Sequence, residues 1–143
     1  MYKRILIPTD GSKLSLKAIK HGISLAKSIK AKVTAVTVSV PFEALAFELM
    51  TETSEQYQKH AANLAAKHLR IVTDMAAAAG VACNVVHVEH YLPYEAIIIA
   101  AKKARCDLIV MASHGRRGYA AVLLGSETVK VLTHTKIPVL VYR

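Results

Sequence analysis

The chain has 143 residues, 53% of them hydrophobic, and carries 19 lysine and arginine residues against 10 acidic residues, a formal net charge of +9. This length fits a single domain over residues 1–143 that buries about two thirds of its unfolded surface. Composition excludes a membrane-spanning helix, because no apolar run approaches roughly 18 residues, and it indicates neither a disulfide framework nor a zinc site, because Cys83 and Cys106 lie far apart.

The first half of the chain predicts two strands and two helices. Residues 3–8 form a short β-rich run, and Ser12 is suited to cap the amphipathic helix that follows. A strand rich in Val and Thr is predicted over 32–40. After an apolar connection with a partial helical pattern, a long helix is predicted over 54–79, and Gly80 stands where glycine ends many helices.

The second half continues the alternation of strands and helices. Strands are predicted over 81–88 and 108–112, with a helix over 93–105 between them. The last helix is predicted over 126–133 and the last strand over 138–142. Strands separated by helices predict an α/β domain with a parallel sheet, helices on both faces and right-handed crossovers. Periodicity alone does not give the order of the strands.

The most informative motif follows the apolar run that ends at Ala112. Ala112-Ser113-His114-Gly115 is followed by nine residues and then by Gly125-Ser126. Because glycine lacks a Cβ, backbone N–H groups beside it can approach an anion closely. Ser126 can supply a hydroxyl, an N–H and a cap at the start of the next helix. A strand that feeds a helix through glycines in this way is suited to hold a phosphate.

This spacing resembles the universal stress protein family, whose nucleotide-binding members carry Gly, two residues, Gly, nine residues, Gly and then Ser or Thr. Here Ala112 stands at the first glycine position. Residues 2–12 are similar to the family's opening strand and turn, and residues 137–141 to its closing strand. The resemblance therefore covers essentially the whole chain. It implies a Rossmann-like fold of the adenine nucleotide alpha hydrolase type, with five parallel strands in the order 3-2-1-4-5.

In that order the loops after the first and fourth strands diverge and open a crevice. The resemblance implies that an adenine nucleotide binds there. Asp10 can accept hydrogen bonds from ribose hydroxyls or an exocyclic amine, or it serves only as a turn-forming residue for Gly11 and Ser12. The implied nucleotide-binding positions are Pro8, Thr9, Asp10, Val38, Met111, Ala112, Gly115, Arg116, Gly125, Ser126, Glu127 and Thr128.

The expected cofactor is ATP or another adenine nucleotide, ADP or AMP, with Mg²⁺ or Mn²⁺ neutralising the phosphates. Arg116 and Arg117 lie inside the proposed anion loop, so we expect Arg116 to contact phosphate. Most lysines instead recur at helical spacing and form a solvated basic surface. Ala112 adds one methyl group to the crevice wall without removing a backbone donor. The sequence does not choose among the three nucleotides.

Catalysis has little support in the sequence. No Gly-x-x-x-x-Gly-Lys-Ser/Thr motif is present, Asp10 has no obvious carboxylate partner, and the histidines do not show metal-ligand spacing. We therefore assign no catalytic and no metal-ligating residues, and expect at most slow hydrolysis of bound ATP. His114 suggests a general base, but a residue in this place more often braces the loop.

We interpret the chain as a cytoplasmic stress-response regulatory module. We expect it to form a homodimer through its last strand, and the sequence leaves open whether it also binds an unidentified protein partner. The location rests on the absence of a signal segment before the first strand. The alternative is a dimeric interaction protein with a vestigial glycine loop, which Ala112 supports best. A basic nucleic-acid or membrane binder is disfavoured because two Phe and six Tyr are scattered along the chain. An adenylate-forming enzyme is disfavoured because its glycine-rich loop after the first strand is absent.

Overall fold

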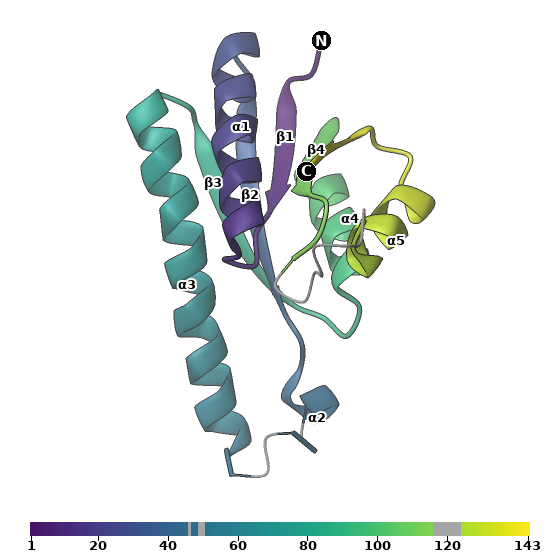
Figure 1. Cartoon of the computed structure of the whole chain (residues 1–143). Coiled ribbons are helices and arrows are strands. Elements are labelled where there is room, and N and C mark those ends of the chain that lie inside the picture. Colours follow the sequence, from purple (N-terminus) through teal and green to yellow (C-terminus); the bar gives the residue numbers. More distant parts are fainter. Residues whose placement is uncertain (46, 49–50, 116–123) are drawn as a thin grey trace.

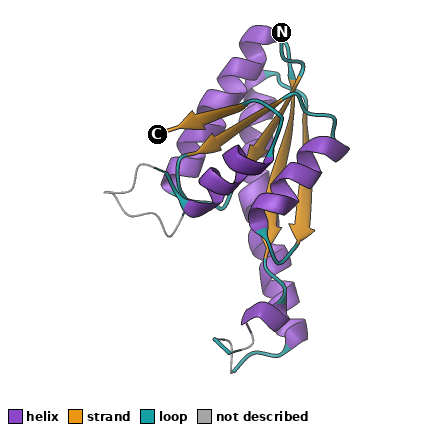
Figure 2. Cartoon of the chain, turned by 90° about the vertical axis from the view of Figure 1, so that its right-hand side faces the viewer, coloured by secondary structure: helices purple, strands orange, loops and turns teal. Residues whose placement is uncertain are grey.

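Five parallel strands form one sheet (Figures 1 and 2). The computed structural model describes residues 1–45, 47–48, 51–115 and 124–143. The strands are β1 (Arg4–Pro8), β2 (Lys32–Ser39), β3 (Cys83–Glu89), β4 (Leu108–Ala112) and β5 (Val139–Tyr142). They pair in the order β3-β2-β1-β4-β5, which confirms the order implied by the family resemblance.

Helices cover both faces of the sheet (Figure 1). On one face lie α1 (Lys13–Ile29) and α3 (Ser54–Ala79), and on the other α4 (Pro93–Lys103) and α5 (Ser126–His134). The apolar connection after β2 contains the single turn α2 (Phe42–Leu45), which contacts α3. No helix in the described ranges is long and apolar enough to cross a membrane.

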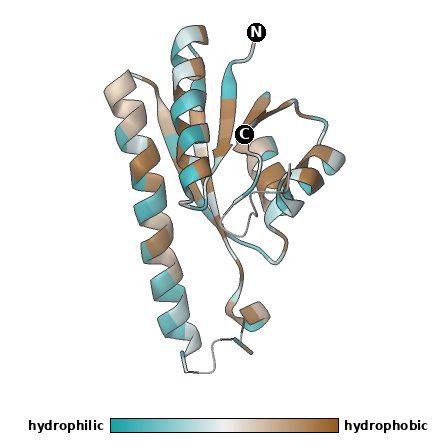
Figure 3. Cartoon of the chain, in the orientation of Figure 1, coloured by the Kyte–Doolittle hydropathy of each residue, from teal (hydrophilic) through white to brown (hydrophobic). Residues whose placement is uncertain are grey.

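The core consists of two apolar layers, one on each face of the sheet. Successive side chains of a strand point to opposite faces, so Ile5 and Ile7 pack under α1 and α3 while Leu6 packs under α4. All three side chains are fully buried. The helices are amphipathic: along α3, apolar and polar residues alternate at helical spacing (Figure 3).

The predicted helix ends are largely confirmed. The Ser12 hydroxyl accepts a hydrogen bond from Ser15 N at 3.1 Å, so Ser12 caps α1 as expected. At the start of α3, Thr53 and Gln56 form a reciprocal capping box. Gly80 ends α3 with φ of 72°, a left-handed conformation that glycine adopts without steric cost.

Asp107 aligns the two strands that define the centre of the sheet. Its carboxylate accepts hydrogen bonds from the backbone N–H of Lys3 at 2.9 Å and of Arg4 at 2.9 Å. Burial alone would raise the pKa of this carboxyl, but the amides of Arg4 and Lys3 outweigh it and hold the pKa below the ordinary 3.8. Because Asp107 directly precedes β4, this clamp fixes β1 and β4 in register, and their far ends meet at the site described next.

Candidate functional site

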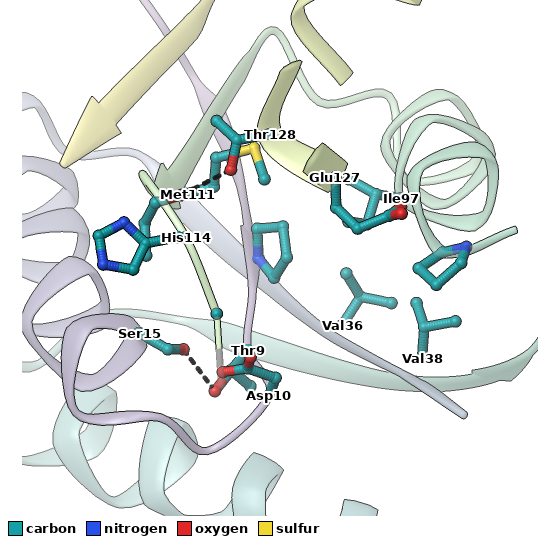
Figure 4. Close-up of a pocket in the computed structure, with 14 residues that line it drawn as sticks. Thr9, Asp10, Ser15, Val36, Val38, Ile97, Met111, His114, Glu127 and Thr128 are labelled. Atoms are coloured by element: carbon teal, nitrogen blue, oxygen red, sulfur yellow. Dashed lines mark hydrogen bonds between the residues drawn. The ribbon is translucent and has the colours of Figure 1, made fainter. Parts of the chain in front are cut away.

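A cavity of about 260 Å³ opens at the carboxyl ends of β1, β2 and β4, beside the first turns of α4 and α5 (Figure 4). Its position is the point where neighbouring strands send their connections to opposite faces of the sheet. The sequence predicts a binding site at this point. Nine of the predicted positions line the cavity: Pro8, Thr9, Asp10, Val38, Met111, Ala112, Gly115, Glu127 and Thr128.

Among the described residues, two other predicted positions are not part of this lining. Gly125 and Ser126 lie at the start of α5 outside it, and Arg116 falls outside the residues that the structure describes. Five further residues line the cavity: Ser15, Val36, Pro93, Ile97 and His114. Val36 was detectable from the sequence, since it stands two residues before Val38 and therefore faces the same side of the strand.

The turn after β1 is held from several directions. Thr9 donates its N–H to Val36 O at 2.9 Å and accepts from the Thr37 hydroxyl at its own carbonyl, also at 2.9 Å. The Thr9 hydroxyl accepts from the Ser15 hydroxyl at 2.8 Å and from Gly11 N at 3.3 Å. This part of the cavity wall is thus a rigid piece of backbone joined to both β2 and α1.

Asp10 brings the first loop against the loop after β4. One carboxylate oxygen, Oδ1, accepts from Ser12 N at 3.0 Å, the turn geometry expected of an Asp at this position. The other oxygen, Oδ2, packs against Gly115 so closely that a Cβ built there would lie only 2.2 Å away. A glycine is therefore required at position 115 for the Asp10 carboxylate to occupy this place.

The loop after β4 is tied to α5 and to the last strand. Gly125 N donates to Ser113 O at 2.6 Å, and the Thr128 hydroxyl donates to Ala112 O at 3.0 Å. A Cβ on Gly125 would approach the His114 Cβ to 2.9 Å, so glycine is needed here by close packing. His114 Nδ1 lies 3.1 Å from the Ser113 hydroxyl, and its ring lies on the side of the loop away from Ile97 (Figure 4). These contacts agree with a bracing role for His114.

The expected cap of α5 is wrong by one residue. Gly125 is the N-cap, with φ of −70° and ψ of 158°, and the exposed Ser126 is the first helical residue. Ser12 and Thr53 cap α1 and α3 with their side chains, but glycine has no side chain to accept from the first amides of α5. Those N–H groups are suited to an external anion.

Glu127 joins the first turns of α5 and α4. Its Oε2 accepts from Tyr94 N at 2.8 Å, and its Oε1 lies 3.3 Å from Lys130 Nζ. Leu92, the N-cap of α4, makes no side-chain hydrogen bond to the helix, so Glu127 supplies the missing acceptor from a helix 33 residues away. The same carboxylate faces the cavity.

The cavity combines an apolar slot with two carboxylates. The apolar walls come from β2, α4 and β4: Val36, Val38, Pro93, Ile97 and Met111. Asp10 and Glu127 add negative charge, whereas the described part of the lining contains no lysine or arginine. Within the ranges that the structure describes, no group of three or more His, Cys, Asp or Glu side chains is placed to hold a metal ion.

Known proteins resemble this chain in sequence and in fold. The family model described as the universal stress protein family matches residues 1–143. The universal stress protein MJ0531 of Methanocaldococcus jannaschii is 37% identical over 149 residues, which cover 100% of this chain and 83% of that protein. The chain therefore belongs to the universal stress protein family, as its motifs indicated.

Solved structures are similar over almost the whole chain. MJ0577 of Methanocaldococcus jannaschii has a TM-score of 0.82 at 28% identity, covering 99% of this chain and 96% of that one. A universal stress protein in complex with cAMP has a TM-score of 0.72 at 24% identity, covering 99% and 97%. The Archaeoglobus fulgidus protein in complex with dAMP has a TM-score of 0.72 at 15% identity, covering 99% and 98%. The last two share the fold with this chain.

Proposed function

We propose that this chain binds an adenine nucleotide in the cavity at the ends of β1, β2 and β4, and that it acts as a stress-response regulatory module through its bound state. One observation carries the proposal: a single cavity joins an apolar slot to a loop that enters a glycine-capped helix. The slot suits a flat base, and the first amides of α5 suit a phosphate.

The charges of the cavity favour one orientation of the nucleotide. Asp10 and Glu127 repel phosphate, so the base and ribose belong in the slot and the phosphates outside it, toward the first turn of α5. Asp10 is placed to accept from ribose hydroxyls, while Arg116 remains a phosphate contact proposed from the sequence alone. Mg²⁺ or Mn²⁺ would be held by the phosphates rather than by a ready-made protein site, and would reduce the repulsion from the carboxylates.

Two proteins of the same fold were solved with cAMP and with dAMP, which supports an adenine nucleotide as the ligand here. Both ligands carry a single phosphate, so the number of phosphates that this chain accepts has to be measured. Ala112 affects how many phosphates fit, because it lines the cavity, is 9% exposed and has a methyl group that narrows the cavity beside the loop.

The direct experiment uses protein purified without added nucleotide. The protein is denatured, and the supernatant is analysed by absorbance and mass spectrometry for adenine nucleotides. Titration calorimetry with ATP, ADP, AMP and GTP, each with Mg²⁺, then measures affinity and preference. We expect a released adenine nucleotide or measurable adenine binding with weaker guanine binding. Absence of both results contradicts the proposal.

We further propose a homodimer through β5. This strand is an edge of the sheet, and an open edge has to be paired or covered. Leu140 on β5 is 48% exposed, and Val129 and Leu132, one turn apart on α5, are 44% and 40% exposed. These apolar side chains favour a protein contact on this side of the molecule.

The second candidate is a dimeric interaction protein that binds no nucleotide. It is favoured by Ala112 at the first motif position and by the exposed apolar residues of α5 and β5. The denaturation and calorimetry experiments separate the two candidates directly. Slow ATP hydrolysis, if present, is proposed to be secondary to binding, and the cytoplasmic location stays a prediction.

A further inference from the structure

Glu127 caps α4 and also lines the cavity, and the capping contact alone does not account for its position in the lining. Tyr94 N lies 2.8 Å from Oε2 and Lys130 Nζ lies 3.3 Å from Oε1, so the carboxylate is held in one position by its neighbours. An ionised carboxylate can accept about four hydrogen bonds. These two contacts therefore leave acceptor capacity on a group that faces the cavity.

The position of this carboxylate decides which part of a ligand it meets. Glu127 lines the same cavity as Ile97 and Val36, whose side chains form the slot, and Figure 4 shows it on the opposite side of the view from Asp10. Asp10 lies where the two loops meet, against Gly115. A base held between Val36 and Ile97 would thus present a polar edge to Glu127, while the sugar would lie nearer Asp10.

We propose that Glu127 selects a purine with an amino group at position 6 over a purine with an oxygen there. The proposal rests on the proposed nucleotide site and names the residue responsible for its preference. An ionised carboxylate accepts hydrogen bonds and cannot donate them. The adenine amine donates to it, whereas the 6-oxygen of hypoxanthine or guanine is an acceptor that is desolvated without a partner and repelled by the charge.

The test compares ATP with ITP, which share ribose and phosphates and differ in the base at position 6. We expect the wild-type protein to bind Mg²⁺-ATP at least about tenfold more tightly than Mg²⁺-ITP in calorimetric titration. In Glu127→Gln the side-chain amide can donate to an oxygen or accept from an amine, so the ratio falls toward one. The amide oxygen can still accept from Tyr94 N, so the melting temperature should change little.

A matched control is available in the first turn of α4, the helix whose N-terminus Glu127 contacts. Glu95 lies in the first turn of α4 and pairs with His90 at 3.7 Å, but it does not line the cavity. Glu95→Gln removes the same charge near the same helix terminus, and the ATP to ITP ratio should stay at the wild-type value. Glu127→Met provides a second test, because it fills similar space and removes the repulsion, although it also removes the acceptor for Tyr94 N; its melting temperature shows whether it folds, and the ATP to ITP ratio should fall in it as well.

The outcomes separate this inference from the proposed function. If ATP binds and the ATP to ITP ratio is the same in wild type and in the folded Glu127 variants, the selection is made elsewhere and the proposed nucleotide site stands. A fall of the ratio in Glu95→Gln as large as in Glu127→Gln also overturns the inference, because it would show a general charge effect. If the wild-type protein binds neither nucleotide, both proposals are wrong.

Discussion

Gly115→Ala tests whether the contact between the two loops is required for binding. The added Cβ would lie 2.2 Å from Asp10 Oδ2, about 1 Å inside van der Waals contact. Because that oxygen is at the end of a side chain, Asp10 can rotate away, at the cost of its hydrogen bond from Ser12 N. We expect a loss of about 1 kcal/mol in the free energy of unfolding without ligand, or about 4 °C in melting temperature.

The effect on ligand binding should be larger than the effect on folding. At a ligand concentration of about 100 times Kd, binding stabilises the wild-type protein by about 2.7 kcal/mol. If the displaced carboxylate and the methyl group weaken binding about 100-fold, the same concentration stabilises Gly115→Ala by only about 0.4 kcal/mol. Thermal unfolding with and without Mg²⁺-ATP measures this difference directly.

Gly80→Ala is the control for the cost of changing a glycine. Gly80 has φ of 72° and nothing within 4 Å of its added Cβ, so this change strains the backbone of α3 without touching the cavity. It should lower stability by about 1 kcal/mol while leaving the gain from ligand at the wild-type value. Adding Gly115→Ala to an Asp10→Ala protein should cost little further stability, since the obstructing carboxylate is gone. A full ligand gain in Gly115→Ala would refute the placement of the ligand between these loops.

Three other changes test separate parts of the structure. Asp107→Asn should lower the free energy of unfolding by about 1 kcal/mol near neutral pH. Because the pKa of Asp107 is lowered in the folded state, its contribution to stability is present above the unfolded pKa and is lost as pH falls through the folded pKa. Chemical denaturation should therefore show a smaller difference between variant and wild type below pH 3.8, and a difference that does not change with pH would contradict the clamp. Ser126→Ala should leave unliganded stability near wild type, because Gly125 is the cap, but should reduce nucleotide affinity in calorimetry; unchanged affinity would remove Ser126 from the proposed site. Val141→Lys should shift the proposed dimer toward monomer in sedimentation, because a lysine in an apolar strand contact has no partner, and an unchanged dimer mass would place the interface elsewhere.

The architecture was predictable because local signals in this chain agree with the tertiary structure. Ile5, Leu6 and Ile7 form a continuous apolar run that is fully buried, with side chains alternating between the two faces of the sheet, and Ser12 caps the helix that follows this strand. Gly80 similarly marks the end of α3. Strand order could not be obtained in this way, because periodicity shows which faces are apolar but not which strands are neighbours. The family resemblance supplied the order, and the structure confirmed it.

The site was predictable in position and less so in detail. The motif identifies Gly115 and Gly125, but glycine is needed at the two positions for different reasons. Gly115 makes room for Asp10, and Gly125 makes room for His114. The contact between Asp10 and Gly115 joins residues 105 positions apart in the chain, and no local pattern announces it. Serine is a common helix cap, so the sequence predicts Ser126 as a cap of α5, whereas the N-cap in the structure is Gly125, which packs closely against His114.

The two carboxylates of the cavity are fixed by the fold before any ligand arrives. Asp10 accepts from Ser12 N, and Glu127 accepts from Tyr94 N, so each is oriented by a backbone amide. Ordering a side chain on binding costs affinity, and groups that are already ordered avoid most of that cost. Isosteric changes that keep the amide contacts should therefore alter ligand preference more than they alter the scaffold. This is why Glu127→Gln is more informative than truncation, which would lose the cap of α4 together with the acceptor.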